Sequence, residues 1–94
     1  MNRHERGMHK LLTQNYIHAT TIRDAFNCSY EKAKEIFAKA KEQELKKSLI
    51  DVRPNAVQSK TVIQITGSNY NYLKKQFKER MALKEIIPQE NQNE

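Results

Sequence analysis

Side chains that can bind an anion are concentrated between residues 21 and 39, where cations and hydroxyl groups alternate with apolar positions. Lysine and arginine neutralise phosphate groups, and hydroxyl groups hydrogen-bond phosphates or base edges. This chemistry is typical of nucleic-acid recognition rather than of substrate turnover. We expect the binding residues to be Thr21, Arg23, Ser29, Tyr30, Lys32, Lys34 and Lys39, with Arg53 and Lys60 further along the chain.

The charge of the whole chain also favours an anionic partner. Its 94 residues include 17 lysines and arginines against 11 acidic residues, which gives a net charge of +6. Such an excess favours a nucleic acid, and less directly an acidic protein or a membrane surface. Hydrophobic residues make up 37% of the chain, enough for the single core of one small domain.

A helix-turn-helix would position the expected binding residues. Thr20 or Thr21 can cap a short helix over residues 22–26, and Asn27 tolerates the left-handed conformation of a tight turn. Ser29 can cap a longer helix over residues 30–45, which is rich in Ala, Lys and Glu. The helical spacing predicts that this helix buries Ala33, Ile36, Phe37 and Ala40.

The opposite face of the long helix carries both signs of charge. Its centre is expected to show Glu31, Glu35 and Glu42, and these carboxylates repel phosphates. An approach by the N-terminal end would instead bring Ser29 and the first lysines to the groove and keep the later carboxylates clear. The alternative is a solvated helix whose charges pair with one another.

Residues 48–66 change pattern and predict a wing. Residues 49–52 and 56–58 can form a short β-hairpin around the turn at Arg53. Residues 60–66 then form a short helix closed by Gly67, or residues 61–66, which are rich in β-branched side chains, form a strand paired with residues 49–52. Both alternatives place a wing after the long helix, and wing residues such as Arg53 and Lys60 contact phosphates or the minor groove.

Two further helices complete the expected domain. Apolar spacing predicts the first over residues 5–17, with a start weakened by Gly7. The last, from residue 68 or 69 to about 83, carries five basic residues. One domain over residues 1–87 is therefore expected, followed by a disordered polar tail over residues 88–94.

The last helix carries an apolar stripe formed by Leu73, Phe77 and Met81. This stripe can pack on the domain's own core or pair with a second copy of the chain, and proteins with a helix-turn-helix often bind DNA as dimers. The lysines of the same helix can also extend the phosphate-binding surface. These alternatives stay open from the sequence.

Catalysis and cofactor binding are not expected. His4, His9 and His18 are scattered, Cys28 is the chain's one cysteine, and two glycines make no phosphate-cradling loop. We interpret Cys28 as a packing residue at the turn, with redox sensing as the alternative. No apolar run reaches the roughly 20 residues of a membrane span, and the N-terminus lacks a signal-peptide pattern. We therefore expect a cytoplasmic protein with no enzymatic activity.

Two spaced motifs resemble those of a known family. Thr21, Asp24, Cys28-Ser29, Ala33 and Ile36, followed by Val57, Val62, Ile65 and Gly67, resemble the small excisionase and MerR-type winged helix-turn-helix proteins of phages and mobile elements of Gram-positive bacteria. The similarity covers about residues 20–67. It differs where Gln58 replaces an expected proline and where the wing is poorer in Arg and Gly. The resemblance implies DNA binding near recombination sites or promoters.

The sequence therefore predicts a mostly α-helical fold: a helix-turn-helix with a short β-hairpin wing and a C-terminal basic helix. The expected function is sequence-specific binding of double-stranded DNA as an excisionase or transcription regulator, together with a recombinase or another protein of the same element. The alternative is a small phage-type interaction module or inhibitor that docks on an acidic host protein. The carboxylates at the centre of the long helix favour this alternative.

Overall fold

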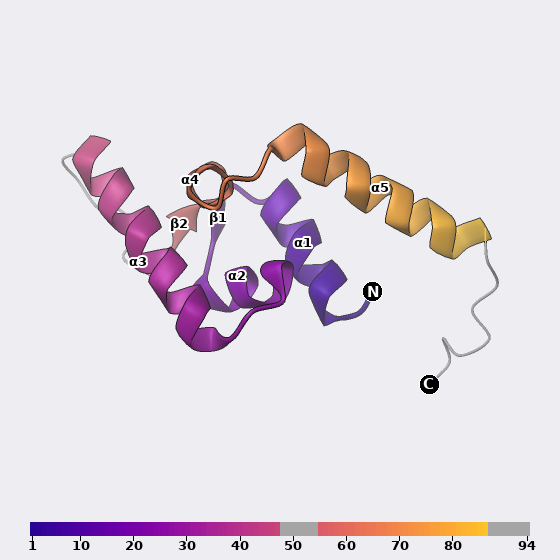
Figure 1. Ribbon diagram of the computed structural model, residues 1–94, viewed down its shortest axis with the longest axis horizontal. Helices are drawn as coiled ribbons and strands as arrows, with labels where there is room; N and C mark the ends of the chain where they lie inside the picture. The colour runs from indigo at the N-terminus through magenta and orange to yellow at the C-terminus, as the bar shows by residue number, and fades with distance from the viewer. Residues whose placement is uncertain (48–54, 87–94) are drawn as a thin grey trace.

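The computed structural model describes residues 1–47 and 55–86, which are mostly helical and include one small two-stranded antiparallel sheet (Figure 1). Arg53, the first arm of the expected hairpin and the tail over residues 88–94 lie outside the described residues. The elements in chain order are α1 (Arg3–Thr13), β1 (Tyr16–Ile17), α2 (Ala19–Phe26), α3 (Tyr30–Lys47), β2 (Val57–Gln58), α4 (Ser59–Ile65) and α5 (Tyr70–Ile86).

The helices are arranged as a sequence of packed neighbours. α3 packs on α2, α2 packs on α1, and α5 packs on the far side of α1. α3 and α5 therefore lie at opposite ends of the longest axis, with α1 and α2 between them (Figure 1). α4 covers one edge of this arrangement and contacts α3 and β2.

α1 is shorter at its C-terminal end than the sequence pattern suggested. It begins at Arg3, where the Asn2 side chain accepts a hydrogen bond from the Glu5 backbone N–H at 2.8 Å and the Glu5 carboxylate accepts one from the Asn2 N–H at 3.0 Å. It ends at Thr13, so the predicted helix over residues 5–17 is wrong at its end. The apolar residues that extended the pattern belong to β1, where Ile17 is fully buried.

Gly7 is a packing position rather than a weak helix start. A Cβ atom built on Gly7 would lie 2.5 Å from the Ala25 backbone nitrogen and 2.6 Å from the Asp24 Cβ. α1 and α2 approach one another so closely here that any side chain would separate them.

The turn between α2 and α3 confirms two local predictions and corrects a third. Asn27 adopts the left-handed conformation, with φ of 52° and ψ of 48°. Ser29 Oγ accepts a hydrogen bond from the Lys32 backbone N–H at 3.1 Å, which caps α3. α2 instead begins after His18, so neither Thr20 nor Thr21 is its N-cap.

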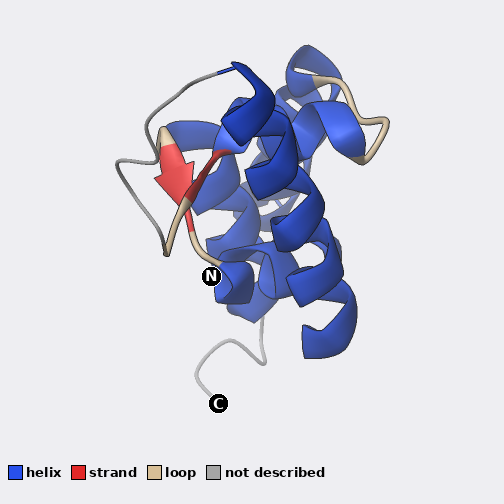
Figure 2. Ribbon diagram, turned by 90° about the vertical axis from the view of Figure 1, so that its left-hand side faces the viewer, coloured by secondary structure: helices blue, strands red, loops and turns tan. Residues whose placement is uncertain are grey.

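The small sheet joins segments that are far apart in the sequence. β2 pairs with β1 in antiparallel register, with Tyr16 opposite Gln58 and Ile17 opposite Val57 (Figure 2). This partner of residues 57–58 was not predicted. α4 confirms the helical alternative for residues 60–66 and excludes the strand, and Gly67 follows it with φ of 74°.

The core lies between α1, α2, α3, α4 and the sheet. Its fully buried large side chains include Leu11, Ile17, Ile22, Val57 and Val62. α3 contributes Ala33 and Ala40, both 0% exposed, as its periodicity predicted.

Ile36 and Phe37 are only partly buried and pack against the edge of the core, so the prediction that both face inward holds in part. The small alanines bring α3 close to α2 and leave the larger residues at the margin. There Lys41 Nζ lies 5.7 Å from the centre of the Phe37 ring. Among the described helices, none combines the length and the apolar character that crossing a membrane requires.

Candidate nucleic-acid interface

The first turns of α3 bring most of the predicted binding residues together. Ser29, Tyr30, Lys32 and Lys34 are all exposed at this end of the helix. Lys34 Nζ lies 5.4 Å from the centre of the Tyr30 ring, a cation–π contact that keeps the ammonium group at the surface. Lys39 is also exposed, further along the same helix.

Carboxylates share this surface, as the sequence indicated. Glu31, Glu35 and Glu42 are exposed, and Glu42 Oε1 lies 3.8 Å from Lys46 Nζ one turn later. At this distance and exposure the ion pair stabilises the helix by only a few tenths of a kcal/mol, about 0.3–0.5. The N-terminal end of α3 is therefore the part of the helix where cations and hydroxyl groups have the fewest carboxylates beside them.

The two predicted residues of α2 differ in their access to solvent. Thr21 is 6% exposed, which leaves its side chain little surface for a phosphate, so we leave it out of the interface. The Arg23 side chain is 30% exposed, and its Nε lies 3.0 Å from Asp24 Oδ1, so its charge is partly neutralised within α2.

Asp24 accepts from two cations. Burial raises the pKa of this carboxyl, but hydrogen bonds from Arg3 and Arg23 outweigh burial and hold it below its usual range. The Arg3 contact, 2.8 Å from Nε to Oδ1, joins the start of α1 to α2. Asp24 therefore links α1 to α2 through its ion pair with Arg3. It also neutralises part of the charge of Arg23.

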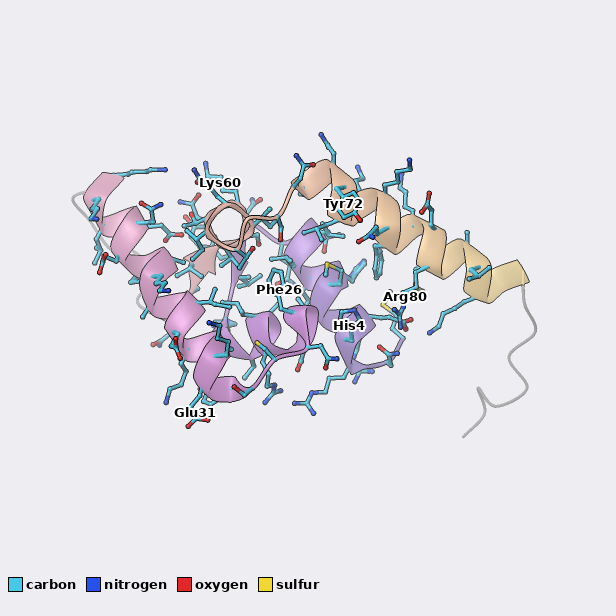
Figure 3. All side chains as sticks on the ribbon, viewed as in Figure 1. His4, Phe26, Glu31, Lys60, Tyr72 and Arg80 are labelled. Carbon is cyan, nitrogen blue, oxygen red and sulfur yellow. The ribbon has the colours of Figure 1, made fainter. Side chains whose placement is uncertain are left out.

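Lys60 lies apart from the start of α3. It is exposed in the first turn of α4, and Figure 3 shows it near the top of the molecule, whereas Glu31 at the start of α3 lies at the bottom. It borders a cleft of about 690 Å³ whose wall includes Tyr16 and Tyr70, and the Tyr70 hydroxyl donates to the Leu12 carbonyl oxygen at 3.1 Å. Lys60 thus belongs to a different surface from Ser29 and Lys34.

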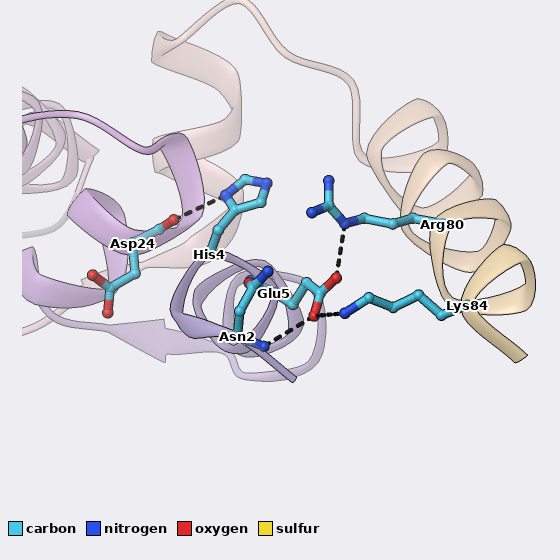
Figure 4. A network of polar contacts seen from close by, with 6 residues as sticks. All are labelled: Asn2, His4, Glu5, Asp24, Arg80 and Lys84. Atoms are coloured by element: carbon cyan, nitrogen blue, oxygen red, sulfur yellow. Dashed lines mark hydrogen bonds and ion pairs between the residues drawn. The ribbon is translucent and has the colours of Figure 1, made fainter. Parts of the chain in front are cut away.

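A buried ion cluster at the other end of the molecule was missed from the sequence. Glu5 is 0% exposed, and its carboxylate accepts from Arg80 Nε at 2.9 Å and from Lys84 Nζ at 2.6 Å (Figure 4). Burial raises the pKa of Glu5, but the hydrogen bonds from Lys84, Arg80 and the Asn2 backbone lower it overall to about 2. The one available signal was the capping-box spacing of Asn2 and Glu5, which does not indicate the partners on α5.

The apolar stripe of α5 packs on the chain's own α1. The Phe77 ring centre lies 6.1 Å from that of His9, and Leu73 packs against the core. Phe77 and Met81 are half-buried. A homodimer through these three residues stays a prediction, and α1 already covers part of the stripe that it would use.

Comparisons with known proteins bring no relative to this chain: no family model, no curated protein and no solved structure matches it significantly.

Proposed function

We propose that this protein binds double-stranded DNA by inserting the N-terminal end of α3 into the major groove. The observation that carries the proposal is the exposed, capped start of α3, held against α2 by the three-residue turn at Asn27. This supports the interpretation of α2 and α3 as a helix-turn-helix, a motif in which the start of the second helix meets base edges. Tyr30, Lys32 and Lys34 are the side chains offered to the groove, and Lys39 follows along the helix.

The order of the elements supports a winged form of this motif. A strand before α2 pairs with a strand after α3, so both ends of the helix pair are fastened to the same small sheet. The segment that contains Arg53 connects α3 to β2 in the sequence. A contact of Arg53 with phosphates beside the groove stays a prediction.

The proposed role is that of an accessory or regulatory factor of a phage or mobile element, either an excisionase or a transcription regulator. It rests on the resemblance of residues 20–67 to small excisionase and MerR-type proteins. In this role the protein acts on DNA in the bacterial cytoplasm, alone or with a recombinase of the same element, and a homodimer would read two half-sites. This role requires binding only, and the protein need not catalyse a reaction itself.

A second candidate is docking on an acidic or mixed-charge protein surface. The exposed carboxylates Glu31, Glu35 and Glu42 favour it, because alternating charges suit a protein partner better than a phosphate backbone. The start of α3 favours DNA instead, because residues 30–34 contain Tyr30, Lys32 and Lys34 and a single carboxylate, Glu31.

Fluorescence anisotropy with labelled duplexes tests the proposal. Phosphate-mediated binding weakens linearly in log affinity against log salt, with a slope of about −0.9 for each neutralised phosphate. Selection from a pool of random duplexes then identifies the preferred site. Binding that ignores salt, or no binding to any duplex, would reject DNA as the partner and favour the protein-docking alternative.

A further inference from the structure

The two sides of α5 have different roles. The side that faces α1 uses Arg80 and Lys84 to bind the buried Glu5, and Phe77 contacts His9 (Figures 3 and 4). These two cations are therefore committed to holding the helix in place. The other basic residues of α5 take no part in this contact with α1.

Three further lysines lie on the rest of the helix surface. Lys74, Lys75 and Lys78 are exposed, and no carboxylate among the described residues forms an ion pair with them. Lys74 Nζ lies 5.9 Å from the Tyr70 ring centre, which keeps its charge at the surface. We name Lys74, Lys75 and Lys78 the α5 basic face.

The charge of this face fits a row of phosphates. Lys74 and Lys78 are one helical turn apart, about 6 Å along the axis at 1.5 Å per residue, and Lys75 lies beside them. Glu79 is the one exposed carboxylate among the described side chains of α5, whereas α3 exposes Glu31, Glu35 and Glu42. The α5 basic face is therefore less interrupted by negative charge than the proposed reading helix.

The α5 basic face and the exposed face of α3 look away from each other. α3 buries its alanines toward α2, and α5 turns its Glu5-binding side toward α1. α1 and α2 lie between α3 and α5 in the order of packed helices, and Figure 1 shows α3 at one end of the longest axis and α5 running from above α1 to the other end. The two surfaces are therefore candidates for separate DNA contacts.

We propose that the α5 basic face binds a second DNA duplex, so that one protein chain bridges two DNA segments. The proposal rests on the proposed function, since it assigns the first duplex to α3. Phosphate contacts by lysines on a regular helix give this second site little preference for sequence. The bridge would therefore join one selected site to any nearby DNA.

The test compares three forms of the full chain: the wild type, Lys74→Gln/Lys75→Gln/Lys78→Gln, and the matched triple Lys32→Gln/Lys34→Gln/Lys39→Gln. Glutamine keeps helix propensity and removes one charge at each exposed position. A biotinylated duplex on beads captures the protein, and a fluorescent duplex added afterwards reports bridging. Sedimentation without DNA gives the oligomeric state, and circular dichroism checks the fold.

The wild type is expected to capture the second duplex and to bind two short duplexes per chain in stoichiometric titration. Each triple variant should still bind one duplex and lose co-capture by at least about tenfold, because three phosphate contacts are removed from one site.

Four results would overturn the bridge. A wild type that binds one duplex but never a second refutes this inference and leaves the proposed function intact, whereas a wild type that binds none refutes both. Undiminished co-capture by the α5 triple would mean that bridging comes from paired α3 surfaces. Binding of polyglutamate to the α5 basic face in place of duplex would assign that face to an acidic protein.

Discussion

At the residue scale, Glu5 is a fully buried carboxylate in a basic chain. It closes the start of α1 and accepts from Arg80 and Lys84, so one side chain joins the first helix to the last. Arg80 is 49% and Lys84 31% exposed at the side chain, so water screens part of the attraction. The contact fixes α5 on α1 more than it stabilises the whole fold.

Acid sensitivity follows from the lowered pKa of Glu5. The pKa falls from 4.5 to about 2 on folding, so the unfolded chain binds the proton more readily and acid favours unfolding. The contribution of Glu5 to stability is complete above pH 4.5 and is lost as the pH falls toward 2. Urea unfolding measured across this pH range should show a decline in the free energy of unfolding.

Glu5→Gln isolates this effect, because glutamine retains the capping-box interaction but has no charge. We expect a loss of about 1–3 kcal/mol at pH 7 and a weaker dependence on pH between 4.5 and 2. Glu79→Gln, which removes an exposed carboxylate of α5, is the matched control and should change little. An unchanged acid profile in Glu5→Gln would refute the buried ion cluster.

At the element scale, the close approach of α1 and α2 at Gly7 offers a direct test of how these helices pack. Gly7→Ala would gain helix propensity of about 1 kcal/mol in an isolated helix. Here the added Cβ meets the backbone of α2, so we expect a net loss of about 1–3 kcal/mol in the free energy of unfolding.

Gly67→Ala is the comparison for Gly7→Ala. A Cβ at Gly67 has no atom within 4 Å, and its cost is the positive φ of 74° alone, about 1–2 kcal/mol. Thermal melts and urea unfolding of both variants measure the difference. A Gly7→Ala protein that is more stable than the parent would show that α1 and α2 are further apart than described.

The rotation of α3 gives a second test at this scale. Ile22 of α2 is fully buried, so Ile22→Ala should cost about 2–5 kcal/mol. Phe37 lies at the edge of the core, and Phe37→Ala should cost less than the 3–5 kcal/mol typical of a buried phenylalanine. If Phe37→Ala proved the more damaging of the two in urea unfolding, α3 would be rotated toward its phenylalanine side.

Local signals predicted the helices well and non-local contacts poorly. The asparagine turn and the serine cap between α2 and α3 depend on neighbouring residues, and both were found as expected. The pairing of Ile17 with Val57 depends on residues forty positions apart, and the apolar pattern of Ile17 continued that of a helix. The partners of Glu5 lie 75 and 79 residues away, and no spacing rule connects them.

At the scale of the whole molecule, the basic charge is divided between two helices that do not pack on each other. The start of α3 carries exposed Tyr30, Lys32 and Lys34, and α5, on the far side of α1, carries further exposed lysines. Of the residues predicted to bind DNA, Thr21 is buried and Lys60 lies on a separate surface, because both assignments depended on how the helices pack. The sequence predicted which helix carries the charge, whereas the relative directions of the two basic surfaces follow from the tertiary structure.

The most direct test of the central claim, that the start of α3 reads DNA, is the affinity of Lys34→Ala for the duplex selected from a random pool and for an unrelated duplex. Lys10→Ala, which removes an exposed lysine of α1, is the matched control. We expect Lys34→Ala to lose about 1–3 kcal/mol on the selected duplex and much less on the unrelated one, while Lys10→Ala changes both slightly. Wild-type affinity of Lys34→Ala for both duplexes would contradict the claim.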